Sequence, residues 1–113
     1  MPTTTGERDR AVREAAAIRL APGRPTRQMW ARLAALVAEH GVSGAELDAA
    51  PVRLVAMSEV RDTDWLVVVE VDGKVVRHRV QSVAPAKGRV RVKFGSGGAI
   101  DAPETDSLLV ERA

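Results

Sequence analysis

Basic side chains gather in the second half of the sequence, where residues 73–100 contain seven Lys or Arg and no Asp or Glu. Arginine presents its N–H donors in a planar fork that can bind two oxygens of a phosphate group, and lysine adds a mobile point charge. The chemistry that these residues offer is the binding of anions, and a nucleic-acid backbone is the simplest partner. The seven residues are Lys74, Arg77, Arg79, Lys87, Arg89, Arg91 and Lys93.

The other charges also lie in blocks. Residues 15–38 contain four arginines and no acid, whereas residues 39–72 contain eight acids and two arginines, so the net charge of +2 results from cancellation. In the first block, the segment 22–25 (Pro-Gly-Arg-Pro) resembles part of an AT-hook, whose Arg-Gly-Arg-Pro motif lies in the minor groove. Only Gly-Arg-Pro matches, and an ordinary linker is the alternative. We predict that Arg24 and Arg27 assist the main basic block.

Nucleophiles and metal ligands are sparse in this sequence. The absence of cysteine excludes disulfide bonds, thiolate metal sites and cysteine nucleophiles. The two histidines, His40 and His78, are far apart in the sequence, and neither has a carboxylate that would orient it as a base. We therefore predict a protein that is not an enzyme and that has no cofactor and no metal site.

Two further segments resemble functional motifs without their full pattern. Asp101, Glu104 and Asp106 form an acidic cluster, but it lacks the ligand density of a calcium loop. The glycine-rich run at residues 95–98 follows a predicted strand, yet no helix and no Lys-Ser/Thr pair comes after it. This run therefore indicates a hairpin and not a phosphate-binding loop.

The three aromatic residues, Trp30, Trp65 and Phe94, limit the kinds of binding site that the chain can build. Methyl-lysine cages and proline-binding grooves need several surface aromatics, and so does the stacking of single-stranded bases. Any contact with nucleic acid is therefore expected to use phosphates and to have low sequence specificity.

Helix signals dominate the first 50 residues. The segment 1–6 has nothing to bury and is predicted to be disordered. Good helix formers and a 3.6-residue apolar period then predict helices over residues 7–21, 27–40 and 44–50.

The boundaries of these helices carry capping residues. Thr26 is a candidate N-cap, Gly41 follows the second helix at the usual C′ position, and Ser43 with Glu46 has the spacing of a capping box. The apolar stripe of the second helix consists of Met29, Leu33, Leu36 and Val37, widened by Trp30 and Ala34.

The segment 36–47 resembles a helix-turn-helix with Gly-Val-Ser at the turn. The second helix of this pair is short, ends at Pro51 and carries Glu46 and Asp48, where a recognition helix would face phosphates. The pattern therefore favours a structural turn between two helices.

From Val52 onward the apolar period changes from 3.6 to 2, which indicates strands. Strands are predicted over residues 52–60, 65–71, 74–80 and 88–94, with a short return strand at 99–100 and a closing strand at 108–110. The Asp72-Gly73 pair favours a two-residue type I′ turn. This turn pairs Val67 with His78, and the resulting inward face contains Leu54, Ala56, Val60, Trp65, Val67, Val69, Val76, Val80, Val90, Val92 and Phe94.

The same register predicts a ladder of like charges on the outer face. A hairpin that closes Val80 on Gly88 sets Arg77 opposite Arg91 and Arg79 opposite Arg89. Like charges directly opposite each other destabilise a sheet unless something compensates them. An anionic partner would compensate them, and internal ion pairs, for instance between Asp101 and Lys93, are the alternative.

Short antiparallel strands with a tight turn before the last one resemble a small five-stranded SH3-like or Tudor-like barrel, over about residues 52–111. The predicted fold class is α+β, with a helical region at residues 7–50 and a barrel-like domain at 51–113. A barrel of this size is marginally stable alone, so the helices are expected to cover it or to dimerise.

The sequence thus predicts a small non-catalytic protein that binds duplex DNA or structured RNA through a basic sheet face. The alternative is a protein-interaction or assembly module, such as an adaptor, a phage or mobile-element part or a homodimer, because the basic and acidic blocks are complementary. No segment is long and apolar enough for a membrane span, and no secretory signal is visible. We expect a cytoplasmic protein, and the Arg-, Ala- and Val-rich composition favours a high-GC bacterium as the source.

Overall fold

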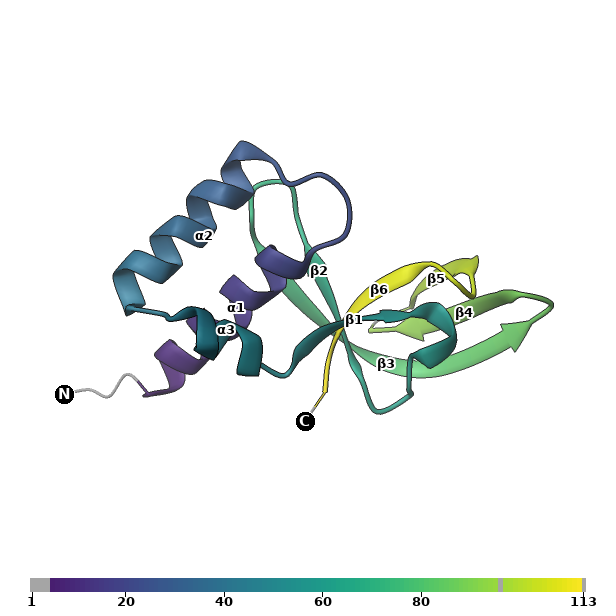
Figure 1. The fold of residues 1–113 in the computed structure, drawn as a ribbon. Coiled ribbons are helices and arrows are strands. Elements are labelled where there is room, and N and C mark those ends of the chain that lie inside the picture. Colours follow the sequence, from purple (N-terminus) through teal and green to yellow (C-terminus); the bar gives the residue numbers. More distant parts are fainter. Residues whose placement is uncertain (1–4, 96, 113) are drawn as a thin grey trace.

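The computed structural model describes residues 5–95 and 97–112. Three helices come first in the chain: α1 (Thr5–Leu20), α2 (Arg27–His40) and α3 (Gly44–Ala49). Strands and a short 3₁₀ helix follow: β1 (Val52–Ala56), η1 (Met57–Glu59), β2 (Trp65–Val69), β3 (Val75–Ala86), β4 (Arg89–Phe94), β5 (Gly98–Pro103) and β6 (Ser107–Glu111). The helices lie at one end of an elongated molecule and β4 and β5 at the other (Figure 1).

The helices confirm the sequence prediction, including their caps. The Thr26 hydroxyl accepts a hydrogen bond from the Met29 amide at 3.1 Å, and Gly41 ends α2 with a φ of 60°. Ser43 and Glu46 form the predicted capping box at the start of α3. Of the segment 1–6 predicted to be disordered, residues 1–4 lie outside the described residues, whereas Thr5 and Gly6 belong to α1.

The strands form one antiparallel sheet in the order β1-β6-β2-β3-β4-β5. It has six strands and not five, because residues 98–103 form a full strand where only a short return strand was predicted. Among the residues that the structure describes, no hydrogen-bonded pairing joins the edge strands β1 and β5. The fold is therefore α+β with an open antiparallel sheet, and a closed five-stranded barrel is not what forms.

The hairpin between β2 and β3 has a different turn from the predicted one. The Glu70 amide donates to the Lys74 carbonyl at 2.8 Å, which closes a three-residue loop, and Gly73 adopts a φ of 89°. This is the pattern of a turn that ends in a left-handed glycine, and it adds one residue to the predicted loop. The register is consequently shifted by one, so Val67 pairs with Arg77 instead of His78.

The hairpin between β3 and β4 differs more. The two-residue turn is Lys87-Gly88, with φ values of 51° and 80°, as a type I′ turn requires. β3 continues through Pro85, which pairs with Val90. Proline is tolerated there because it lies close to the strand end, beside the turn. The predicted closure of Val80 on Gly88 is therefore wrong, and Val80 pairs with Phe94.

The sheet buries both of its faces, whereas the sequence predicted one inward face. Val67 and Leu109 pack with the helices in a first core, and Leu66 and Val110 pack on the other face in a second core. Leu66 is fully buried although the predicted register placed it outside, and Trp65, predicted to be inside, is 37% exposed. Leu54 is exposed as well.

The first core joins the alanine-rich face of α1 to α2, α3 and the sheet. Ala15, Ala16 and Ala17 are completely buried, and Leu33 of α2 belongs to the same cluster. Trp30 does not widen the apolar stripe of α2 as predicted, because it is 55% exposed, and Ala34 is exposed too.

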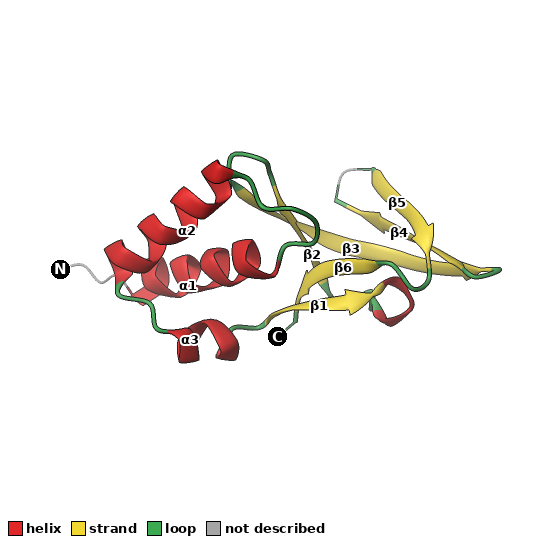
Figure 2. Ribbon diagram, turned by 45° about the horizontal axis from the view of Figure 1, so that its top comes forward, coloured by secondary structure: helices red, strands yellow, loops and turns green. Residues whose placement is uncertain are grey.

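The long strand β3 connects the two ends of the molecule. Its first part pairs with β2 near the helices, and its second part pairs with β4 (Figure 2). The second core, beneath β3, β4 and β5, includes Val80, Val90 and Val92. The resulting molecule measures 50 × 29 × 26 Å.

Candidate nucleic-acid interface

Strand β4 determines which basic side chains face solvent. Val90 and Val92 are 2% and 0% exposed and point into the second core. Because successive side chains of a strand point to opposite faces, Arg89, Arg91 and Lys93 all lie on the outer face. Lys87 precedes them in the turn. We call these four residues the β4 row.

Small side chains flank the β4 row on β3. Arg91 pairs with Ala84, Arg89 with Ala86 and Lys93 with Ser82. The predicted ladder, with Arg77 opposite Arg91 and Arg79 opposite Arg89, is therefore wrong. The ladder was wrong because the turn was predicted at the wrong place. The turn lies at Lys87-Gly88, so the second part of β3, and not the part with Arg77 and Arg79, pairs with β4.

On the other side of the row, β5 supplies one acid. Asp101 lies opposite Arg91 but forms its ion pair with Arg89, at 2.9 Å between Oδ1 and Nε. Among the described residues, Lys87, Arg91 and Lys93 form no ion pair within 4.0 Å. The pairing of Asp101 with Lys93 expected as an alternative is not seen. The row therefore keeps three uncompensated cations.

Arg77 and Arg79 lie apart from the β4 row, on the first part of β3. The Arg77 guanidinium is 2.5 Å from a carboxylate oxygen of Glu111, and its carbon is 4.5 Å from the centre of the Trp65 ring. Arg79 pairs with Trp65 in the register and is exposed.

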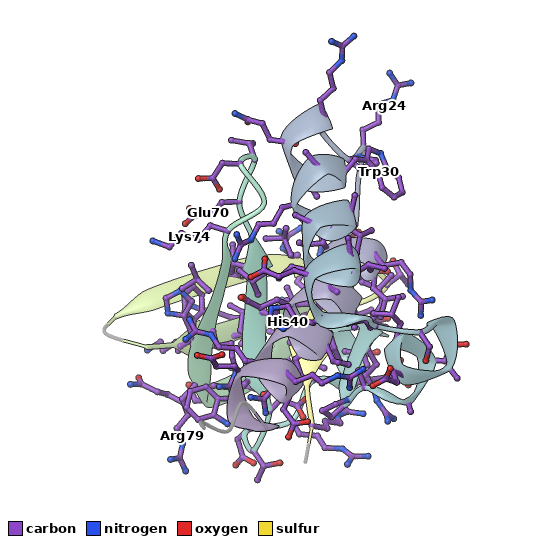
Figure 3. All side chains as sticks on the ribbon, turned by 90° about the vertical axis from the view of Figure 1, so that its left-hand side faces the viewer. Arg24, Trp30, His40, Glu70, Lys74 and Arg79 are labelled. Carbon is purple, nitrogen blue, oxygen red and sulfur yellow. The ribbon has the colours of Figure 1, made fainter. Side chains whose placement is uncertain are left out.

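Arg24 and Arg27 belong to the helical end of the molecule. Arg24 is in the linker between α1 and α2, and Arg27 is the first residue of α2. In the view of Figure 3, Arg24 and Arg79 lie at opposite ends of the molecule. The predicted binding residues thus fall into three separate groups, and the β4 row is the largest.

The two histidines occupy structural positions. His78 is half-buried, pairs with Leu66 and not with Val67 as predicted, and has its ring centre 5.1 Å from that of Phe94. The backbone carbonyl of His40 accepts a hydrogen bond from Arg8 at 3.2 Å. Within the described part of the chain, no group of three or more His, Asp or Glu side chains is arranged to hold a metal ion.

Sequence reasoning missed two buried acids. Asp64 is 1% exposed and binds Arg112 through both carboxylate oxygens, at 2.8 and 3.2 Å. This hydrogen bonding raises the pKa of the Arg112 guanidinium. Glu111 is 6% exposed and contacts both Arg13 and Arg77. Glu111 directly follows the predicted apolar closing strand, and this position was the one indication that its carboxylate could be buried. Its partners, Arg13 and Arg77, lie far from it in the sequence.

The acids of α3 also have structural partners. Glu46 pairs with Arg8, and Asp48 pairs with Arg19 at 2.7 Å, so both fasten α3 to α1. The hydrogen bond from Arg8, together with the one from the Ser43 amide, lowers the pKa of Glu46 to about 2. These contacts give a structural role to the two acids that had argued against a recognition helix.

No protein-family model, no curated protein and no solved structure matches this chain. Of the helices that the structure describes, none is long and apolar enough to span a membrane.

Proposed function

We propose that this protein binds the backbone of a nucleic-acid duplex, either DNA or structured RNA, through the β4 row and without catalysis. One observation carries the proposal: Arg91 and Lys93 on the exposed face of β4, and Lys87 in the adjoining turn, have no ion-pair partner within 4.0 Å among the described residues. A row of charges of the same sign raises the local positive potential, and this potential attracts a polyanion.

The surroundings of the row suit a linear polyanion. Alternate residues of a strand are about 7 Å apart, so the outward side chains of β4 form an evenly spaced line. The flanking residues Ala84, Ala86 and Ala99 are exposed and small, and they leave this line accessible. Phosphate contacts of this kind position a protein on nucleic acid and carry no base information, so the expected sequence specificity is low.

The aromatic residues support contacts with phosphates and not with bases. Trp30 and Trp65 belong to α2 and β2, and Phe94 packs against His78 at the end of β4. None of the three is therefore available as a stacking platform next to Arg91. With about three phosphate contacts, we expect weak binding, with a Kd of about 10⁻⁴–10⁻⁶ M at physiological salt.

Fluorescence anisotropy of a labelled DNA duplex and a labelled RNA duplex over a salt series tests the proposal. The logarithm of the binding constant should fall against the logarithm of salt concentration with a slope of about −3. The double substitution Arg91→Glu with Lys93→Glu should reduce both the affinity and the slope.

The matched control is Arg53→Glu with Arg61→Glu, which changes the net charge equally at exposed positions outside the row. This control should bind more tightly than the β4 variant. The absence of binding at low salt, or equal losses in both variants, contradicts the proposal.

A second candidate function is a protein-interaction module centred on Trp30. Tryptophan is enriched at the centres of protein interfaces, and Trp30 is exposed on α2 (Figure 3). Sedimentation velocity at increasing concentration would support self-association if a dimer forms and Trp30→Ser abolishes it. A monomer at all concentrations would count against a homodimer.

The likeness of residues 52–111 to SH3-like or Tudor-like barrels remains a prediction. In its favour, the amides of Met57 and Ser58 in η1 donate hydrogen bonds to the carbonyls of Asp106 and Glu104 in the loop between β5 and β6, at 2.7 and 3.1 Å. These bonds bring the two ends of the β region together outside the strand pairing.

A further inference from the structure

A second basic feature, separate from the β4 row, lies between α1 and the hairpin of β2 and β3. It is a groove of about 480 Å³, the size range of small-molecule sites. The hairpin runs along the helices in Figure 1, and the groove opens where the two meet. The basic residues that line it are Arg10, Arg13, Lys74 and Arg77.

The cations of this groove outnumber its acids. Glu111, which is nearly buried, is shared by two arginines, since Arg13 lies 3.6 Å and Arg77 2.5 Å from it. One carboxylate cannot neutralise two guanidinium groups. The other acid of the groove, Glu14, is likewise shared by Arg10 at 4.0 Å and Arg32 at 3.4 Å.

Lys74 adds a cation that forms no ion pair among the described residues. Its side chain is exposed on the hairpin, close to Glu70 in sequence (Figure 3). The four basic and two acidic residues that line the groove therefore give it a net charge of +2. Each of the two acids is already shared between two arginines.

One cation of the groove, Arg77, is held by contacts on two sides. Arg77 is bound by Glu111 on one side and covers the Trp65 ring on the other, at 4.5 Å. A guanidinium has five N–H donors, and a single carboxylate uses only some of them. An arginine that is already oriented loses less conformational entropy when it binds an oxyanion.

The floor of the groove is apolar. Val52 and Val67 belong to the first core, and Val75 packs against it. A ligand that fits such a site needs a charged end for the arginines and an apolar part for the valines. This requirement distinguishes the groove from the β4 row, where no apolar floor lies between the cations.

We infer that this groove binds a small organic anion, in which a carboxylate or phosphate group is attached to an apolar body. The oxyanion lies against Arg13 and Arg77, Lys74 and Arg10 contribute long-range attraction, and the apolar body covers Val67 and Val75. The inference does not depend on the binding of nucleic acid.

Trp65 provides the test, because it contacts Arg77 directly. In a Trp30→Phe variant, Trp65 is the remaining tryptophan, and its emission is recorded during titration with hexyl phosphate, hexanoate and 1-hexanol. We expect a saturable change with at least one of the two anions, with a Kd of about 1 mM or lower, and no such change with the neutral alcohol. The stronger anion identifies the headgroup class.

Two double variants at exposed positions complete the test, because exposed substitutions of this kind are not expected to disturb folding. Arg10→Gln with Lys74→Gln removes two exposed charges from the groove, and we expect the anion affinity to fall about tenfold. The matched control, Lys87→Gln with Lys93→Gln, removes two charges from the β4 row and should leave the affinity unchanged. The same response to hexanol, no saturable response to either anion, or equal loss in both variants overturns the inference.

Discussion

The two ends of the molecule use their charges differently. At the helical end, charged groups are joined across elements: Arg8 and Arg19 of α1 bind the acids of α3, and Arg13 reaches Glu111 of β6. At the other end, one ion pair among the described residues, Arg89 with Asp101, joins the four cations of the β4 row to an acid. Equal densities of charge in a sequence can therefore end up joined across elements or exposed on one strand face, and the ion pairs of each charge distinguish the two cases.

The cores beneath these surfaces also differ. The first core packs the alanine face of α1 closely against its neighbours, whereas the second contains mainly valines from β3, β4 and β6 around Leu66 and Met57. Close packing of small residues leaves no room for added volume. Because the two cores are separate, a substitution at one end of the molecule can change that end and leave the other intact.

The largest effect is expected where a compensated charge is buried. Asp64→Ala removes the partner of Arg112 and leaves that guanidinium largely buried without its carboxylate. We expect a loss of about 3–5 kcal/mol in the free energy of unfolding, measured by urea denaturation. The neighbouring, exposed Asp62→Ala should cost less than about 0.5 kcal/mol. Similar losses in the two variants would contradict a structural role for the Asp64–Arg112 pair.

A smaller loss is expected from overfilling the first core. Ala16 is completely buried, so Ala16→Leu forces α1 away from its neighbours. The free energy of unfolding should decrease by about 1–3 kcal/mol. The control Ala31→Leu, at an exposed position of α2, should change it by less than about 0.5 kcal/mol. If Ala16→Leu is tolerated equally well, the helical end is packed more loosely than described.

The turn that aligns the β4 row offers a stabilising change. Lys87 has a φ of 51°, a left-handed conformation that costs most residues about 1 kcal/mol and that asparagine tolerates better. We expect Lys87→Asn to raise the free energy of unfolding by up to about 1 kcal/mol. Lys93→Asn, within β4, should not stabilise the protein because asparagine is unfavourable in strands. A stabilisation by the second substitution and not by the first would argue against the type I′ turn.

The smallest effect concerns the ion pair between α1 and α3. The pKa of Glu46 falls from its ordinary value of 4.5 to about 2 in the folded protein, so its contribution to stability is present above pH 4.5 and is lost as the pH falls toward 2. The melting temperature of Glu46→Gln should therefore be below that of the unchanged protein near neutral pH, and the difference should shrink in acid. A difference that does not vary with pH would contradict the link to Arg8.

The helix boundaries could be predicted from the sequence because they depend on residues that are close together in the chain. Thr26, Gly41 and the Ser43–Glu46 box fix the helix ends through contacts within four residues, and the structure confirms them. The change of apolar period at Val52 also located the start of the sheet.

The strand registers could not be predicted because they depend on the geometry of two turns. Asp72-Gly73 has the sequence of a two-residue turn but closes a three-residue loop, and Lys87-Gly88 forms the tight turn although lysine is uncommon at positive φ. The strand predicted to end at Val80 continues as β3 through Pro85 to Ala86. These errors produced the wrong arginine ladder, although Arg89, Arg91 and Lys93 were correctly placed on an outer face.

Ion pairs between residues that are far apart in the chain also could not be predicted from the sequence. The groove with Glu111 combines α1, the β2–β3 hairpin and β6, and residues 13, 77 and 111 are brought together only by the complete fold. Nothing in the local pattern indicates that Arg77 pairs and Arg91 does not. Which arginines are paired could therefore be seen only in the structure.

The most direct test of this distinction is an NMR titration of the ¹⁵N-labelled protein with a short DNA duplex at low salt. We predict that the largest shift changes occur at the amides of residues 87–93, that they weaken as salt is added, and that Arg91→Glu with Lys93→Glu removes them. Changes concentrated in α1 and α3, or no change with either a DNA or an RNA duplex, would contradict the claim that the uncompensated β4 row is the binding surface.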